Sequence, residues 1–245
     1  MIVLRIPALA AAIAVILGSG ASAAAARPAE LSAAALYLPP RSVGESARYA
    51  VTFRSEYGAG PVEEHGAIVI RRASPTRVAM TGFNVIDQGE TAEPRTAPPV
   101  TLSGHAREDG SIGAYTTTTR ISDMVLDYDS LITLLPRNVR ALGAGARWTG
   151  VTRCWLSHTR DTAIPVTVTV AERRGDLVIL RARGRTRIPF TVEGSRVDAD
   201  AAVVVEMRFT GARLTRARLD AAETYRRAGL PAGGSTYTWT LERIS

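Results

Sequence analysis

From Val43 to the C-terminus, apolar and polar residues alternate with a period of two over most of the chain. Successive side chains of a β-strand point to opposite faces, so this alternation predicts strands that bury one face and expose the other. The expected strands are 49–53, 67–72, 78–83, 100–106, 111–119, 148–156, 165–173, 177–183, 188–193, 202–209, 213–222 and 237–243.

Turn-forming residues separate these strands. Asp109-Gly110 predicts a hairpin between strands 100–106 and 111–119, and Gly175-Asp176 predicts a second hairpin after strand 165–173. The Pro-rich segment 93–99 is expected to be an exposed loop, and Gly233-Gly234 is expected to form a turn.

One segment does not show the period-two alternation. Between residues 122 and 135, apolar residues recur at helical spacing, Ser122 is suited to cap the N-terminus and Pro136 blocks continuation. The pattern predicts one amphipathic helix laid against the sheet, with its apolar side formed by Met124, Tyr128, Leu131 and Leu135.

The order of elements predicts an all-β fold with one helix. Connections are short and no βαβ rhythm is present, so residues 43–245 are expected to form a single antiparallel sheet in one domain. A wide flat sheet would leave long edges and an uncovered apolar face, so we expect a curved sheet that forms a half-barrel or a barrel.

The N-terminus has the pattern of a secretory signal peptide. Arg5 precedes an apolar run from Ile6 to Leu17, and Ala21-Ser22-Ala23 provides a small-residue cleavage site. We expect residues 1–23 to be removed after Ala23, residues 24–42 to form an Ala- and Pro-rich leader, and the product to be periplasmic or secreted. The apolar run is too short for a stable membrane span.

All 30 basic residues are Arg, against 23 acidic residues, and the formal net charge is +7. Guanidinium groups bind phosphate and carboxylate in a bidentate manner, and a positive net charge favours encounters with anionic surfaces. We expect an anionic envelope surface, rather than nucleic acid, as the charged partner. Arg181, Arg183, Arg185 and Arg187 alternate along one expected strand and would form a one-faced anion-binding ladder, or a solvated face paired with neighbouring acids such as Glu172, Asp198 and Asp200.

The sequence contains no specific catalytic or metal-binding motif. Cys154 is the only cysteine, so no internal disulfide can form, and neither it nor the three histidines have the spacing of a nucleophilic or zinc site. Asp123, Asp127 and Asp129 lack the glycine turn and bidentate acid of a calcium loop. No cofactor, no metal and no catalytic residue is expected, although an enzyme remains possible. The three histidines are His65, His105 and His158.

Leu135-Pro136, followed by Gly145-Ala146-Arg147-Trp148, resembles the Leu-Pro and Gly-x-x-Trp signature of exported β-sheet proteins of bacterial envelopes. Some of those proteins are similar to the open half-barrels of the lipoprotein-carrier type. The acidic residue that often follows the glycine is absent here. The resemblance implies a helix that leads through a turn into a strand opened by Trp148.

We expect a non-catalytic binding protein, a periplasmic carrier or chaperone whose concave apolar face holds a lipid or another hydrophobic small molecule. The alternative is a structural or interaction protein of the envelope that contacts anionic polymer or a protein partner through its Arg-rich strands. A barrel enzyme such as a lyase or isomerase would require a polar cluster inside the cup. The expected ligand-binding residues are Tyr49, Val51, Phe53, Met124, Tyr128, Trp155, Met207 and Trp239.

Overall fold

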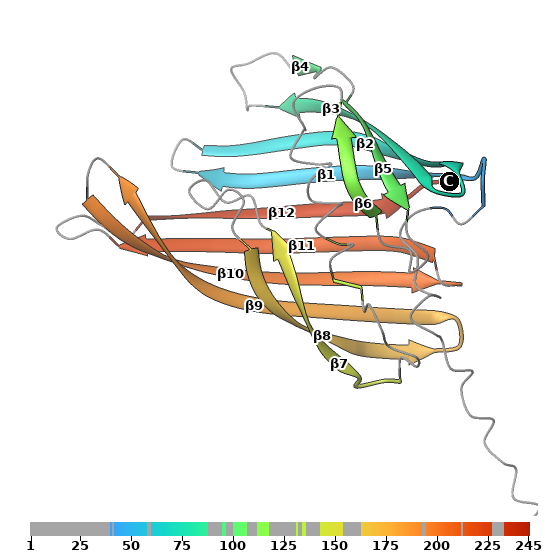
Figure 1. Ribbon diagram of the computed structural model, residues 1–245. Coiled ribbons are helices and arrows are strands. Elements are labelled where there is room, and N and C mark those ends of the chain that lie inside the picture. Colours follow the sequence, from blue (N-terminus) through green and yellow to red (C-terminus); the bar gives the residue numbers. More distant parts are fainter. Residues whose placement is uncertain are drawn as a thin grey trace, which may run out of the picture.

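Twelve antiparallel strands form a single sheet in the part of the chain that the structure describes (Figure 1). The prediction of an all-β protein built on one curved antiparallel sheet is therefore confirmed. The structure is a computed structural model, and it describes residues 40, 42–57, 60–87, 95–96, 100–106, 112–117, 131, 134–135, 143–153, 163–192, 195–211, 213–226 and 233–245.

The strands follow the alternating segments of the sequence, and most are longer than the pattern indicated. Their bounds are β1 (Ser46–Tyr57), β2 (Gly60–Ser74), β3 (Arg77–Asp87), β4 (Arg95–Thr96), β5 (Val100–Ala106), β6 (Ile112–Thr117), β7 (Arg147–Arg153), β8 (Ala163–Arg174), β9 (Leu177–Val192), β10 (Ser195–Thr210), β11 (Arg213–Arg226) and β12 (Gly233–Arg243).

The sheet consists of two meanders joined at the middle. Its strand order is β6-β5-β3-β2-β1-β12-β11-β10-β9-β8-β7, with the short β4 paired to β3. The first and last long strands, β1 and β12, therefore pair with each other from Tyr49↔Arg243 to Glu56↔Thr236. Among the described strands β6 and β7 end the order and do not pair, so the sheet is open rather than a closed barrel.

Three local predictions were wrong. Segments 177–183 and 188–193 belong to one strand, β9, whose pairing with β10 has no register shift from Leu177 to Val192. Gly233-Gly234 begins β12 instead of forming a turn. The expected loop 93–99 contains β4, whose two residues pair with Val85 and Ile86 of β3.

Other predictions fall outside the described residues. These are the signal peptide, the leader to residue 39 and nearly all of the helix at 122–135, of which the structure describes Leu131, Leu134 and Leu135. The hairpin between β8 and β9 is confirmed, since Gly175 connects them with φ of 59°, a left-handed conformation that glycine adopts without steric cost.

One face of the sheet, here called the inner face, carries the apolar core. Along β8 every second residue is buried, and the same alternation continues through β9, β10, β11, β12 and β1. Full burial of one aliphatic or aromatic side chain stabilises a fold by about 1.5–3 kcal/mol, so this face dominates the stability of the sheet. Its largest fully buried residues on the sheet are Trp239, Tyr49, Phe209, Ile68, Ile70 and Met80.

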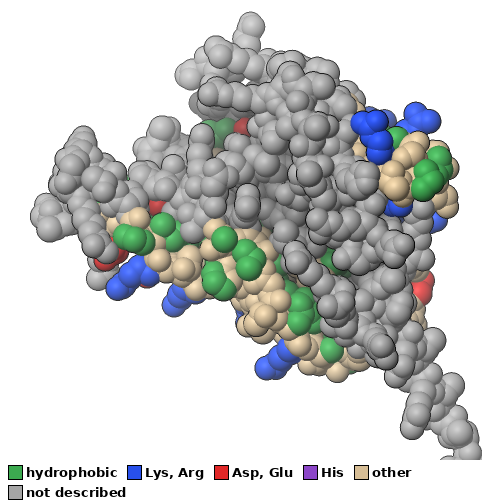
Figure 2. Space-filling model, in the orientation of Figure 1, with side chains coloured by type: hydrophobic (Ala, Val, Ile, Leu, Met, Phe, Trp, Pro, Cys, Tyr) green, Lys and Arg blue, Asp and Glu red, His purple; other side chains and the backbone are tan. Residues whose placement is uncertain are grey.

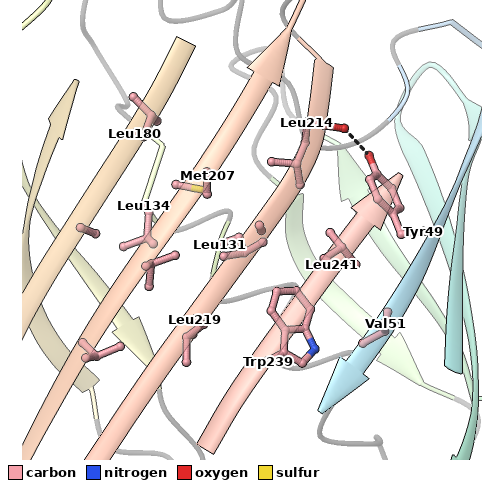
Figure 3. Close-up of a cluster of buried hydrophobic side chains, with 14 of the residues drawn as sticks. Tyr49, Val51, Leu131, Leu134, Leu180, Met207, Leu214, Leu219, Trp239 and Leu241 are labelled. Carbon is pink, nitrogen blue, oxygen red and sulfur yellow. Dashed lines mark hydrogen bonds between the residues drawn. The ribbon is translucent and has the colours of Figure 1, made fainter. Parts of the chain in front are cut away.

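Residues between β6 and β7 cover part of the inner face. Leu131 and Leu134 are fully buried in the same cluster as the inner-face residues, and Figure 3 shows them lying among Leu180, Met207 and Leu219. The indole Nε1 of Trp148, on β7, donates a hydrogen bond of 3.0 Å to the carbonyl oxygen of Leu134. This bond attaches the covering segment to the edge strand.

Gly184 sets the close approach of β8 and β9. A Cβ atom at this position would lie 2.6 Å from Cγ1 of Val166 and 3.1 Å from Cγ2 of Ile164. We expect Gly184→Ala to destabilise the protein by about 1–3 kcal/mol, since overpacking forces neighbouring strands apart. Urea unfolding measures the change. Gly143→Ala is the matched control, because nothing lies within 4 Å of a Cβ there, and equal stability of the two variants would contradict the expectation.

Candidate functional site

Five of the expected ligand-binding residues lie together on the inner face. All five are buried members of the core cluster, and they come from β1, β10 and β12: Tyr49, Val51, Phe53, Met207 and Trp239. Figure 3 shows Tyr49, Val51, Met207 and Trp239 within this cluster. The shared face predicted for Tyr49, Val51 and Phe53 is therefore confirmed. The role of all five residues in ligand binding stays a prediction. The remaining three, Met124, Tyr128 and Trp155, lie outside the described residues.

Aromatic side chains concentrate where the two meanders join. Trp239 on β12 is directly opposite Phe53 on β1 and Leu219 on β11. The rings of Phe53 and Tyr237 pack in a tilted arrangement, with centroids 5.4 Å apart and planes inclined at 35°. Such pairs add stability beyond their buried area and give the join a rigid apolar surface.

Tyr49 places a polar group at one end of this apolar surface. Its hydroxyl donates to the carbonyl oxygen of Leu214 at 3.4 Å, a long bond between β1 and β11. Burial raises the pKa of Tyr49 from its ordinary value of 10.0 to about 12, although the charge of Arg243 acts in the opposite direction. The phenol is therefore held neutral within the core.

A band of inward-facing polar residues crosses the inner face toward the end where β1 and β11 finish. Glu223 on β11 is 1% exposed and lies directly opposite Ala201 on one side and Ser235 on the other. It is the only acid among the buried residues that the structure describes. We call this set the polar band, and its members are Ser55, Thr152, Thr186, Glu223 and Ser235.

Three buried polar atoms in and beside the polar band have no hydrogen-bond partner within the described structure. They are Oγ of Ser55, Oγ1 of Thr152 and Nε1 of Trp239, on β1, β7 and β12. A buried polar group left without a partner costs about 1–3 kcal/mol, so each atom reduces the stability of the sheet. Groups retained at such a cost are candidates for contact with a bound molecule.

The two ends of the inner face carry an acidic and a basic side chain, respectively. Glu223 lies near the end of β11, whereas the buried base Arg72 lies near the end of β2, at the opposite end of the sheet. The Nη2 atom of Arg72 donates to the carbonyl oxygen of Pro75 in the β2–β3 turn. The inner face therefore has an apolar centre between an acidic and a basic end.

Sequence reasoning missed the polar band, although the period-two pattern contained its signal. Ser55 continues the inward series of Tyr49, Val51 and Phe53, and Glu223 continues the inward series of Leu219 and Ala221. A polar residue at an inward position of an otherwise apolar series marks a buried polar group. Their juxtaposition across strands depends on register, which the sequence does not display.

On the opposite, outer face, the four arginines of β9 project to one side as expected. Arg181 pairs with Glu206 of β10 at 2.6 Å, and Arg187 pairs with Asp200 at 3.5 Å. The described residues provide no ion-pair partner for Arg183 and Arg185, which lie opposite Val204 and Ala202. The ladder is therefore half paired and half unpaired. The expected partner Asp200 is confirmed, whereas Asp198 lies opposite Pro189 and not opposite an arginine of β9.

The neighbouring acid Asp220 also accepts hydrogen bonds from adjacent side chains. Arg218 donates to both of its carboxylate oxygens, at 2.8 and 3.1 Å from Nε, and the hydroxyl of Thr238 donates to Oδ1 at 2.8 Å. Partial burial would raise the pKa of Asp220, but these hydrogen bonds outweigh it and lower the pKa. Asp220 is thus a charged acceptor fixed between β11 and β12.

The structure brings no metal-binding set together. Within the described ranges, no group of three or more His, Cys, Asp or Glu side chains is placed to hold a metal ion. His65 is an exposed outer-face residue whose Nε2 lies 2.9 Å from Oε1 of Glu63. Cys154 and His158 lie outside the described residues. No helix in the described part of the chain is long and apolar enough to cross a membrane.

No protein-family model matches the chain, and no curated protein matches it. The two faces of the sheet are therefore the basis for a functional assignment.

The raised pKa of Tyr49 predicts an alkaline loss of stability. Because the folded-state pKa of about 12 exceeds the ordinary tyrosine value of 10.0, the unfolded chain ionises first. The contribution is complete below about pH 10 and is lost as pH rises toward 12, by at most about 1.4 kcal/mol per pH unit. Tyr49→Phe should flatten this part of the profile, measured by urea unfolding from about pH 9 to about pH 11. A variant that loses stability as steeply as the wild type would show that Tyr49 does not cause the loss.

Proposed function

We propose that this protein is an exported, non-catalytic binding protein that holds an amphipathic lipid or another hydrophobic small molecule on the inner face of its sheet. The single observation that carries the proposal is the set of unpartnered buried polar atoms of Ser55, Thr152 and Trp239 beside a continuous apolar surface. A molecule with a long apolar part and a small polar head matches both features.

The apolar centre of the inner face supports binding of the long apolar part of such a ligand. A row of apolar side chains crosses β1, β12, β11 and β10 at the same level of the sheet, in the order Phe53, Trp239, Leu219 and Val205. Known binding sites for hydrophobic ligands are lined mainly by such side chains, with a few polar groups that fix the orientation.

The unpartnered buried donors support binding of a small polar head. Ser55 and Thr152 carry hydroxyls that can donate and accept, whereas the Trp239 indole can only donate. A ligand head with an acceptor oxygen would satisfy these groups and recover the stability they cost. Glu223 in the same band disfavours a carboxylate or phosphate head, because a second acidic group placed beside a buried carboxyl makes the charged form of both less favourable.

Transport outside the cytoplasm belongs to the same proposal. It follows from the expected signal peptide at residues 1–23, which lies outside the described residues, and from the resemblance of the Leu135–Trp148 segment to exported envelope proteins. A carrier of this kind would shield an insoluble molecule from water between two membranes or surfaces.

The test separates stability from binding. Ser55→Ala and Thr152→Val remove unpartnered buried hydroxyls with little change of shape, so each variant should be as stable as the wild type or more stable by up to about 1 kcal/mol. Their affinity for a long-chain alcohol should fall by about twofold to tenfold, the effect of one lost hydrogen bond. Urea unfolding and a displacement assay with a fluorescent fatty alcohol measure the two quantities.

Thr52→Ala is the matched control, since Thr52 is on the same strand as Ser55 but on the outer face, opposite Thr240. Its affinity should equal that of the wild type. The proposal fails if organic extracts of protein purified without detergent contain no lipid and the wild-type protein takes up no long-chain alcohol or fatty acid.

A further inference from the structure

The outer face of β7 to β10 carries a patch in which unpaired cations lie beside exposed aliphatic side chains. Arg183 is opposite Thr167 of β8 and Val204 of β10, and Val204 is 39% exposed. Along the lower edge of the view in Figure 2, Arg side chains project from the molecule with apolar side chains beside them. We call this set the docking patch, and its members are Val151, Pro165, Arg183, Arg185, Ala202 and Val204.

The acids that border the docking patch are already engaged. Glu206 is bound by Arg181 and Asp200 by Arg187, on either side of the unpaired arginines along β9. Asp220, opposite Val204 on β11, accepts hydrogen bonds from Arg218 and Thr238. The positive charge of Arg183 and Arg185 is therefore not neutralised by an acid within the described part of the sheet.

Apolar side chains extend the patch to the edge of the sheet. Val151 on β7 is directly opposite Pro165 on β8, both are exposed, and Val151 is 45% exposed. Exposure of a Val side chain to water is unfavourable, whereas at a lipid surface the same side chain can contact the acyl chains beneath the head groups. A guanidinium group on the same face can form bidentate hydrogen bonds with the phosphate oxygens of a lipid head group.

We propose that the docking patch binds the surface of a bilayer that contains anionic phospholipids. Charge complementarity identifies the head groups as the partners of Arg183 and Arg185, and the exposed Val residues favour a bilayer over a soluble polyanion. The patch is on the opposite face from the proposed ligand site, so this inference holds or fails independently of the proposed function.

The experiment is flotation of the purified protein with vesicles of equal parts phosphatidylglycerol and phosphatidylcholine. Arg183→Ser with Arg185→Ser should lower the vesicle affinity by about tenfold to thirtyfold, since each basic residue near an anionic membrane contributes up to about fivefold. Binding of the wild type should weaken with rising salt and be absent with phosphatidylcholine alone.

The matched control is Arg181→Ser with Arg187→Ser, which lowers the net charge by the same two units on the same face of the same strand. These arginines are already paired, so this variant should lose less than about threefold in affinity. Equal losses in the two double variants would overturn the proposal, because the effect would then come from net charge alone.

Val204→Ser tests the choice of a lipid surface at constant charge. It should weaken vesicle binding by about twofold to fivefold and leave binding of soluble polyglutamate unchanged. If the protein binds polyglutamate as tightly as vesicles and Val204→Ser alters neither, the patch binds polyanions and the bilayer proposal is wrong. Because every position changed is exposed, circular dichroism should show the same fold in all variants.

Discussion

The pairing of β1 with β12 is the interaction on which the rest of this structure depends. It joins residues almost two hundred positions apart, from Tyr49↔Arg243 to Glu56↔Thr236, and it converts two meanders into one sheet. Without it, each meander would expose a long central edge and a divided apolar face. The Phe53–Trp239 and Ser55–Tyr237 pairs lie across this join, so the proposed ligand site exists only when the join has formed. Such non-local pairing carries a high loop-closure cost and makes folding slow.

In this sheet one face is buried. Some positions on this inner face lower the stability of the fold. Most inward positions are apolar and fully buried, and Leu131 and Leu134 pack against them. The polar band interrupts this order with Glu223 and with hydroxyls that the described structure leaves unpartnered. Local departures from good packing are expected where a protein binds or reacts, because function there outweighs stability. This contrast between apolar centre and polar band is the physical basis for an amphipathic ligand.

The sequence predicts which residues share a face much better than which residues face each other. Period-two alternation placed Tyr49, Val51 and Phe53 inward and the four arginines of β9 outward, because side-chain direction is a local property of a strand. The strand bounds predicted from alternation were wrong at two glycine positions. The sequence predicted two strands, 177–183 and 188–193, where β9 is continuous, and the missing side chain of Gly184 permits close approach to Val166. A Cβ on Gly233, which was expected in a turn, would meet the Tyr225 ring. The polar band was overlooked because Glu223 and Ser235 meet only through the register of β11 and β12.

The register of β9 and β10 determines which arginines stay unpaired, and ion pairs do not select that register. With the observed pairing, Arg181 meets Glu206 and Arg187 meets Asp200. A slip of two residues in one direction would place Arg185 opposite Asp200 and Arg187 opposite Asp198, which also forms two pairs. Exposed pairs of this kind contribute only about 0–1 kcal/mol each, so the charges barely distinguish the alternatives. The inner face favours the observed register, because there Gly184, which has no side chain, lies between Val203 of β10 and Val166 of β8, two larger side chains that fill the space around it. The cationic patch on the outer face is thus a consequence of packing on the inner face.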